Sequence, residues 1–211
     1  MSGADALAAG DALDLLDWKR RVFDLYRETR EARDPHAAWL RWRAVRDELF
    51  RSHPQSPLPT ARRQAHDALP FFDYDPAWRL AGQLVDAEPE ERALAASTGG
   101  TFAFTRVGVV RVAAPPRPAV ELELAWNEGY GGGLFLAFTD GTSGAETYAG
   151  GRYLLDTVKG ADLGSDGNRL VLDFNFAYNP SCSYDSRWAC PLAPTANALP
   201  FPVRAGERLV A

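Results

Sequence analysis

Two cysteines lie close together in the stretch DFNFAYNPSCSYDSRWACPL, residues 173–192. Cys182 and Cys190 are separated by seven residues, whereas zinc sites usually pair cysteines about two to four residues apart and need further ligands. Free cysteine is among the most buried residue types, so two thiols packed as small apolar groups are the leading interpretation. A disulfide that closes this short loop is an alternative. No metal site and no cofactor are expected.

Cys182 could also be a nucleophile, which requires a base that forms the thiolate. His53 in HPQSPL is the best histidine for this role, because the flanking prolines place it in a rigid loop. A hydrolase that uses Cys182 with His53 is therefore a competing hypothesis. A second version of the hydrolase hypothesis uses Glu146 or Asp173 for acid–base catalysis, if burial raises the pKa of one of these carboxyl groups.

Polar side chains gather in two further blocks, TSGAETYAGGRY (142–153) and DFNFAYN (173–179). Each block lies at or beside an expected strand end, so hairpin pairing could bring them together. An arginine among carboxylates and amides suits recognition of a polar or anionic ligand. The leading hypothesis is a small-molecule-binding domain, and its expected ligand-binding residues are Arg152, Tyr153, Asp173, Asn175, Tyr178 and Asn179, with Glu146 nearby.

An equally weighted alternative is that these residues stabilise the fold and bind no ligand. In that interpretation Arg152 and Asp173 form a buried ion pair, and the asparagines cap turns. A third hypothesis is a structural or protein-interaction module whose helices present Trp39 or Tyr26 to a partner.

The residues before position 70 are expected to form a pair of helices. Apolar side chains recur at helical spacing over 12–33 and again over 38–49, and Asp34-Pro35 separates the two stretches. In the second helix Arg41, Arg43 and Arg46 fall outside the apolar stripe, and we expect them to form a solvated face. The prolines of 53–59 exclude regular structure there, and a weaker helical pattern follows at 60–67.

After Asp75-Pro76 the apolar period changes to the alternation typical of strands. The segment 102–112 reads as one long strand or as two strands broken by a bulge near Gly108. Short strands with Gly-rich turns and no helices between them favour an antiparallel β-barrel or sandwich. The predicted class is α+β, mainly β, and the expected strands lie near 78–84, 102–112, 120–126, 134–138, 152–158, 169–176 and 207–210.

The predicted domain organisation is a disordered N-terminus at 1–12 followed by a single domain at 13–211. In this domain a helical segment (13–70) packs on the β-barrel or sandwich (76–211). The residues 1–12 are small and acidic, which is typical of a frayed terminus.

Composition restricts the class of partner. Hydrophobic residues at 46% and charged residues at 24% are typical of a globular chain. The formal net charge of −5 argues against nucleic acid as a partner. No signal peptide and no run of about 18 apolar residues is found, so we expect no membrane partner and a cytoplasmic location. Abundant Ala and Arg with few Lys indicate a GC-rich bacterial source.

Several rare blocks resemble one uncharacterised prokaryotic family, the domain of unknown function number 1684. The resemblance is carried in order by WKRRVFDLYRETR, RDELFRSHPQSPL, FFDYDPAWRL, FTDGTSGAETYAGGRYL and DFNFAYNPSCSYDSRWACPLAPTANALP. The family's usual ending carries a Glu and a basic residue where this chain has Ala196 and Ala198. The resemblance implies a fold and a region of interest, and it implies no activity.

Overall fold

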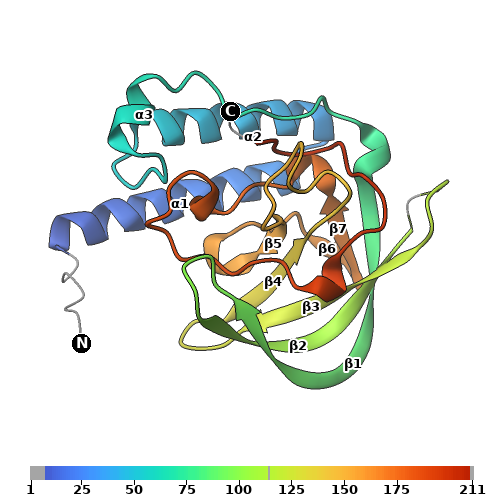
Figure 1. Ribbon diagram of the computed structural model, residues 1–211. Coiled ribbons are helices and arrows are strands. Elements are labelled where there is room, and N and C mark those ends of the chain that lie inside the picture. Colours follow the sequence, from blue (N-terminus) through green and yellow to red (C-terminus); the bar gives the residue numbers. More distant parts are fainter. Residues whose placement is uncertain (1–7, 114, 210–211) are drawn as a thin grey trace.

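A pair of helices covers part of a single curled sheet (Figure 1). The structure is a computed structural model that describes residues 8–113 and 115–209. In chain order its elements are α1 (Ala9–Glu31), α2 (Pro35–Ser52), α3 (Thr60–Gln64), η1 (Pro76–Trp78), β1 (Arg79–Ala95), β2 (Thr101–Val112), β3 (Val120–Asn127), β4 (Gly133–Phe138), β5 (Arg152–Asp156), η2 (Thr157–Lys159), β6 (Ser165–Asp166), β7 (Arg169–Asp173), η3 (Phe174–Phe176), η4 (Ser181–Ser183) and η5 (Thr195–Asn197), where η marks a 3-10 helix.

The helix pair forms where the sequence predicts it. The Asp34 carboxylate caps α2 by accepting hydrogen bonds from the backbone N–H groups of His36 at 2.9 Å and Ala37 at 3.2 Å. Pro35 occupies the first turn, where its missing N–H has no cost. These local preferences explain why the chain reverses at this point. No helix in the described ranges is long and apolar enough to cross a membrane.

The sheet has seven antiparallel strands in the order β5-β4-β3-β2-β1-β7-β6. Strands β5 and β6 are its two edges and do not pair with each other, so the sheet is a half-barrel and not a closed barrel. The predicted α+β class with an antiparallel sheet is confirmed. The register shifts between Arg106 and Gly108 in the β2–β3 pairing, which is the predicted bulge.

Several predicted boundaries differ from the structure. Strand β1 continues to Ala95, beyond the expected end near 84, and the strands expected at 152–158 and 169–176 end at Asp156 and Asp173, where 3-10 helices follow. The expected strand at 207–210 is wrong for its described part, because Glu207 forms only an isolated bridge with Phe71; position 210 lies outside the described residues. Helix α1 begins at Ala9, inside the stretch 1–12 that was expected to be disordered, and residues 1–7 of that stretch also lie outside the described residues.

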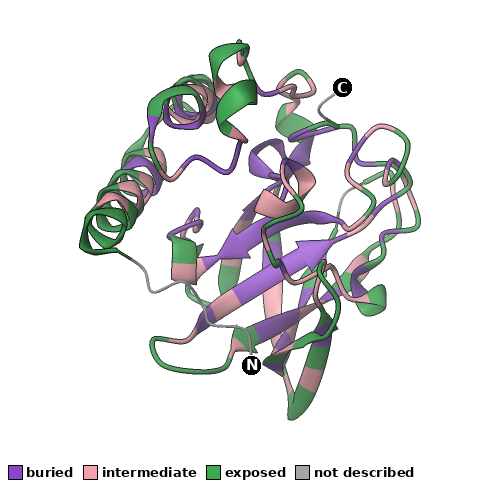
Figure 2. Ribbon diagram, turned by 60° about the vertical axis from the view of Figure 1, so that its left-hand side comes forward, coloured by how far each residue is buried: buried purple, intermediate pink, exposed green. Residues whose placement is uncertain are grey.

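The core consists of two large clusters and one smaller cluster. One fills the curled sheet and includes Leu122, Leu136 and Phe138. The other joins the helices to the sheet through Trp42 of α2, which is completely buried and contacts Phe176 edge-on at 5.1 Å. Figure 2 shows buried residues concentrated in the strands, whereas the helices are exposed over much of their outer surface. The helices are therefore fixed to the sheet by aromatic side chains.

Candidate functional site

Arg152 lies at the start of β5 and only 1% of its side chain is exposed. Its Nη2 donates hydrogen bonds to Asp140 Oδ2 at 2.8 Å and to the Val203 carbonyl at 2.9 Å, and its Nη1 donates to the Ala205 carbonyl. The expected ion pair with Asp173 is wrong, because Asp140, just beyond β4, supplies the carboxylate. Arg152 thus holds the C-terminal segment against the sheet.

Asp173 and Asn175 form a buried cluster at the end of β7. Asp173 Oδ1 accepts hydrogen bonds from the Asn175 backbone N–H at 3.0 Å and side chain at 2.8 Å, and its Oδ2 accepts one from Arg79 at 3.2 Å. Asn175 also exchanges two hydrogen bonds with the backbone of Asp75. Burial raises the pKa of Asp173, and the bonds from Asn175 and Arg79 oppose that rise. The cluster is internally paired and caps η3.

The two predicted polar blocks meet through Tyr153 and Tyr178. The Tyr153 N–H donates to the Tyr178 carbonyl at 2.9 Å, and the Tyr178 N–H donates to the Tyr153 carbonyl at 3.2 Å. The Tyr153 side chain is buried and donates to the Pro191 carbonyl at 2.6 Å. Tyr178 and Asn179 line the inner pocket described below. The other predicted ligand-binding residues, namely Arg152, Tyr153, Asp173 and Asn175, do not line it.

The predicted pair of Cys182 and His53 does not form. His53 Nε2 lies 3.1 Å from Asp17 Oδ2, and its Nδ1 accepts the backbone N–H of Gln55 at 3.0 Å. Both ring nitrogens are therefore engaged away from Cys182, which contacts the Tyr148 hydroxyl at 3.5 Å.

Glu146 lies near the surface in an ion pair with Arg204, with an N–O distance of 2.9 Å. The hydrogen bonds from Arg204 lower the pKa of Glu146, which is the wrong direction for a general base near neutral pH. Across the described ranges, no three His, Cys, Asp or Glu side chains are grouped so that they could hold a metal ion.

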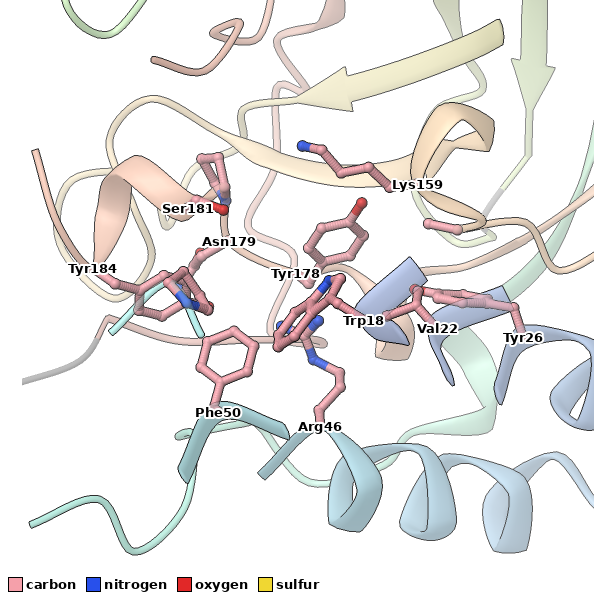
Figure 3. A pocket seen from close by; sticks show the side chains of 13 residues that line it. Trp18, Val22, Tyr26, Arg46, Phe50, Lys159, Tyr178, Asn179, Ser181 and Tyr184 are labelled. Carbon is pink, nitrogen blue, oxygen red and sulfur yellow. The ribbon is translucent and has the colours of Figure 1, made fainter. Parts of the chain in front are cut away.

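An inner pocket of about 80 Å³ lies where α1 and α2 meet the segment that follows β7 (Figure 3). Trp18 of α1 and Phe50 of α2 supply apolar wall. The polar side chains of the lining are Tyr26, Arg46, Lys159, Tyr178, Asn179, Ser181 and Tyr184.

Arg46 extends from α2 toward this pocket, and 13% of its side chain is exposed (Figure 3). Its guanidinium carbon lies 4.8, 5.0 and 5.1 Å from the ring centroids of Trp42, Phe50 and Tyr178. Contacts of this kind stabilise a desolvated cation. Arg46 also donates to the completely buried Glu207 at 3.1 Å. The expectation that Arg46 belongs to a solvated face is therefore wrong.

Glu207 connects the pocket wall to the C-terminal segment. Besides Arg46, it accepts hydrogen bonds from the Asn179 backbone N–H at 3.1 Å and from the Tyr184 hydroxyl. Burial raises the pKa of Glu207, and the Arg46 charge and these hydrogen bonds oppose the rise. Because Glu207 is fully enclosed, its role in this geometry is to position the groups that do line the pocket.

An outer groove of about 460 Å³ continues from the inner pocket. The two share Trp18, Pro57, Lys159 and Ser181, and the groove adds Lys19 and Trp188 among others. Among the residues that the structure describes, neither lining contains a carboxylate side chain, whereas together they contain Lys19, Arg46 and Lys159.

The sequence analysis did not predict the residues that line the groove, although the scarcity of lysine pointed to two of them. The chain has only two lysines, Lys19 and Lys159, and both line the outer groove. They are 140 positions apart, so only the fold shows that they share a surface.

Comparison with known proteins identifies the family. The sequence model of a family described as "Protein of unknown function (DUF1684)" matches residues 64–208. The chain belongs to this family. The DUF1684 match confirms the resemblance carried by the sequence blocks. It begins beyond α2, so the inner pocket combines Tyr178 and Asn179 from the matched region with Trp18 and Arg46 from the preceding helices.

A solution NMR structure of an uncharacterized protein from Haloarcula marismortui is similar to this DUF1684 chain, with 32% sequence identity and a TM-score of 0.57. The alignment covers 79% of this chain and 89% of that chain. No curated protein matches significantly. Ala196 and Ala198, where the DUF1684 family usually has a Glu and a basic residue, are both exposed, so these departures leave the core unchanged.

Proposed function

We propose that the protein binds a small molecule that carries an anionic group on an apolar body. The binding site is the inner pocket together with the outer groove. None of the candidate acid–base or nucleophilic groups, Glu146, Asp173, Cys182 and His53, lines either cavity. Binding is therefore the function that the geometry supports best.

The observation that carries the proposal is the charge of the lining. The chain has a formal net charge of −5, yet the linings, as far as the described ranges 8–113 and 115–209 form them, carry Lys19, Arg46 and Lys159 and no carboxylate. Arg46 is mostly buried and is neutralised from behind by Glu207, so the exposed positive charge of the groove comes from the lysines. Asp156 lies 3.3 Å from Lys159 Nζ without lining the groove, and 53% of the Lys159 side chain remains exposed. A cleft lined by one sign of charge attracts ligands of the opposite sign.

The apolar part of the ligand is indicated by the walls of the groove. Leu15, Trp18, Pro57 and Trp188 supply apolar and aromatic surface along it. Its volume of about 460 Å³ lies within the range of about 300–1,000 Å³ found for small-molecule sites. The inner pocket of about 80 Å³ has room for a small polar group but not for a ring system.

The inner pocket can orient such a polar group. The Tyr178 hydroxyl lies on the Lys159 side of the pocket (Figure 3). It has no hydrogen-bond partner within the described part of the chain. Burial raises the pKa of Tyr178 well above its ordinary value of 10.0, so the phenol stays protonated at neutral pH. It is therefore available as a donor to an anionic ligand.

Two fluorescent probes with the same aromatic body test the proposal. Anilinonaphthalene sulfonate carries an anionic group, and N-phenylnaphthylamine lacks it. At low salt we expect saturable fluorescence with the folded protein, and a dissociation constant about tenfold lower for the sulfonate. Added salt should reduce this difference, because exposed charges are screened. Equal affinity for the two probes, or no saturable binding of the sulfonate, would contradict the proposal.

A further inference from the structure

The two cysteines lie against each other in the structure. Cys182 belongs to η4 and Cys190 ends the loop that follows it. Both thiols are free, and the Cys182 backbone N–H donates to Cys190 Sγ at 3.4 Å. A loop of seven intervening residues thus returns the second thiol to the first.

Polar groups lie around the pair and fix the loop that carries it. The Tyr148 hydroxyl lies 3.5 Å from Cys182 Sγ. The Cys190 N–H donates to Ser97 Oγ at 3.1 Å, and Ser97 Oγ donates to the Trp188 carbonyl at 3.1 Å. These bonds connect the cysteine loop to the turn between β1 and β2, so the loop is held in place from two directions.

The two thiols differ in access and in acidity. Cys182 is partly exposed, whereas Cys190 is 3% exposed. Contact with Cys190 outweighs burial and, with the Tyr148 hydroxyl, lowers the pKa of Cys182 to about 6. Contact with Cys182 and burial raise the pKa of Cys190. Cys182 is therefore the thiolate at neutral pH, and thiolates are the attacking species in disulfide exchange.

We propose that Cys182 and Cys190 form a thiol–disulfide exchange site, with Cys182 as the attacking and Cys190 as the resolving residue. The co-reactant is a low-molecular-weight disulfide. The Cys182 thiolate attacks one sulfur of that disulfide, the S–S bond breaks, and one small thiolate leaves and takes up a proton.

The second step closes the ring. Cys190 loses its proton to solvent and attacks Cys182 Sγ in the mixed disulfide, and the second small thiol leaves with a proton. The products are the Cys182–Cys190 disulfide and two small thiols. Two electrons pass from the protein to the co-reactant, so the protein is oxidised and the small disulfide is reduced. Exchange does not require a ligand in the groove.

The full chain, reduced and then desalted, is incubated with oxidised glutathione, quenched with acid and analysed by intact mass. The wild type should lose two hydrogen atoms in mass without retaining glutathione. Cys190→Ser should accumulate a stable glutathione adduct, because the resolving thiol is absent. Cys182→Ser should react at least about tenfold more slowly than Cys190→Ser. Equal rates for the two variants, or a stable adduct on the wild type, would overturn the proposal.

Alkylation of the wild type provides a test that needs no variant. The iodoacetamide reaction at Cys182, followed by peptide mass, should be half-maximal near the pKa of about 6, because the thiolate fraction rises with pH through the pKa. An unperturbed cysteine reaches this point near pH 8.5, about its free pKa. Half-maximal reaction of Cys182 near pH 8.5, or faster alkylation of Cys190, would overturn the assignment of roles.

Discussion

Replacing Asp140 with alanine is expected to lower the free energy of unfolding by about 3–5 kcal/mol, because it leaves the Arg152 charge buried without its partner. The ion pair is almost fully enclosed, with side-chain exposures of 1% and 0%. Asp140 Oδ1 also accepts hydrogen bonds from the backbone and side chain of Thr142, at 2.7 Å each, and from the Val203 N–H at 3.1 Å. Equilibrium urea unfolding measures the loss.

The double variant Asp140→Ala with Arg152→Met distinguishes two causes of the lost stability. One is the unpaired buried charge of Arg152, and the other is the loss of the hydrogen bonds that Asp140 accepts. Removing both charges should recover a large part of the stability, as replacement of buried ion pairs by apolar groups often does. Glu146→Ala, which breaks a pair near the surface, is the matched control and should leave the unfolding midpoint nearly unchanged. A loss below about 1 kcal/mol for Asp140→Ala would mean that Arg152 is not held as the structure shows.

Glu207→Ala is the second large prediction, also with a loss of about 3–5 kcal/mol. Glu207 is completely buried, and the substitution leaves the Arg46 guanidinium without its carboxylate. It also leaves the Asn179 N–H and the Tyr184 hydroxyl without an acceptor. Equilibrium unfolding in urea gives the loss directly.

Glu207→Gln is the matched control, because it keeps the volume and an acceptor while removing the charge. It should cost less, about 1–3 kcal/mol. If the Gln and Ala variants were equally unstable, the lost charge that both share would account for the whole effect, and the hydrogen bonds from Asn179 and Tyr184 would contribute little. If neither were destabilised, Glu207 would not anchor the pocket wall.

The sequence predicts the sheet well because its signals are local. Glu121 and Glu123 alternate with Leu122 and Leu124 of β3, and the two leucines are buried as the alternation requires. Asp34-Pro35 likewise separates the helices by a cap that involves only neighbouring residues.

The carboxylate that pairs with Arg152 depends on the register between β4 and β5. Local sequence patterns do not determine this register, so they do not predict the ion pair. In the structure Arg152 pairs with Phe138, which brings it beside Asp140. Asp173 pairs instead with Arg79 of β1. Asp140 follows the end of β4 and Asp173 is the last residue of β7. Both carboxylates therefore lie near a strand end, and only the order of the strands in the sheet decides which of them faces Arg152.

The outer groove also could not be predicted from local sequence patterns, because residues far apart in the sequence form it. It depends on how α1 and η2 approach the cysteine loop, and it places Lys19 and Lys159 on one surface. Tyr178 and Asn179 were predicted as ligand-binding residues because they belong to the polar block DFNFAYN (173–179) beside an expected strand end. Arg46 was missed because it lies outside the apolar stripe of α2, where the sequence predicts a solvated arginine. Its aromatic contacts come from residues that are not all on its own helix.

The most direct measurement compares binding of anilinonaphthalene sulfonate to the wild type and to the double variant Lys19→Gln with Lys159→Gln. Arg20→Gln is the control, because it removes one positive charge from an exposed neighbour of Lys19 that lines neither cavity. We expect the double variant to bind about tenfold more weakly at low salt, with unchanged near-ultraviolet circular dichroism, and the control to bind like the wild type. Equal affinity of the double variant and the wild type, or an equal loss in Arg20→Gln, would contradict an anion site in this groove.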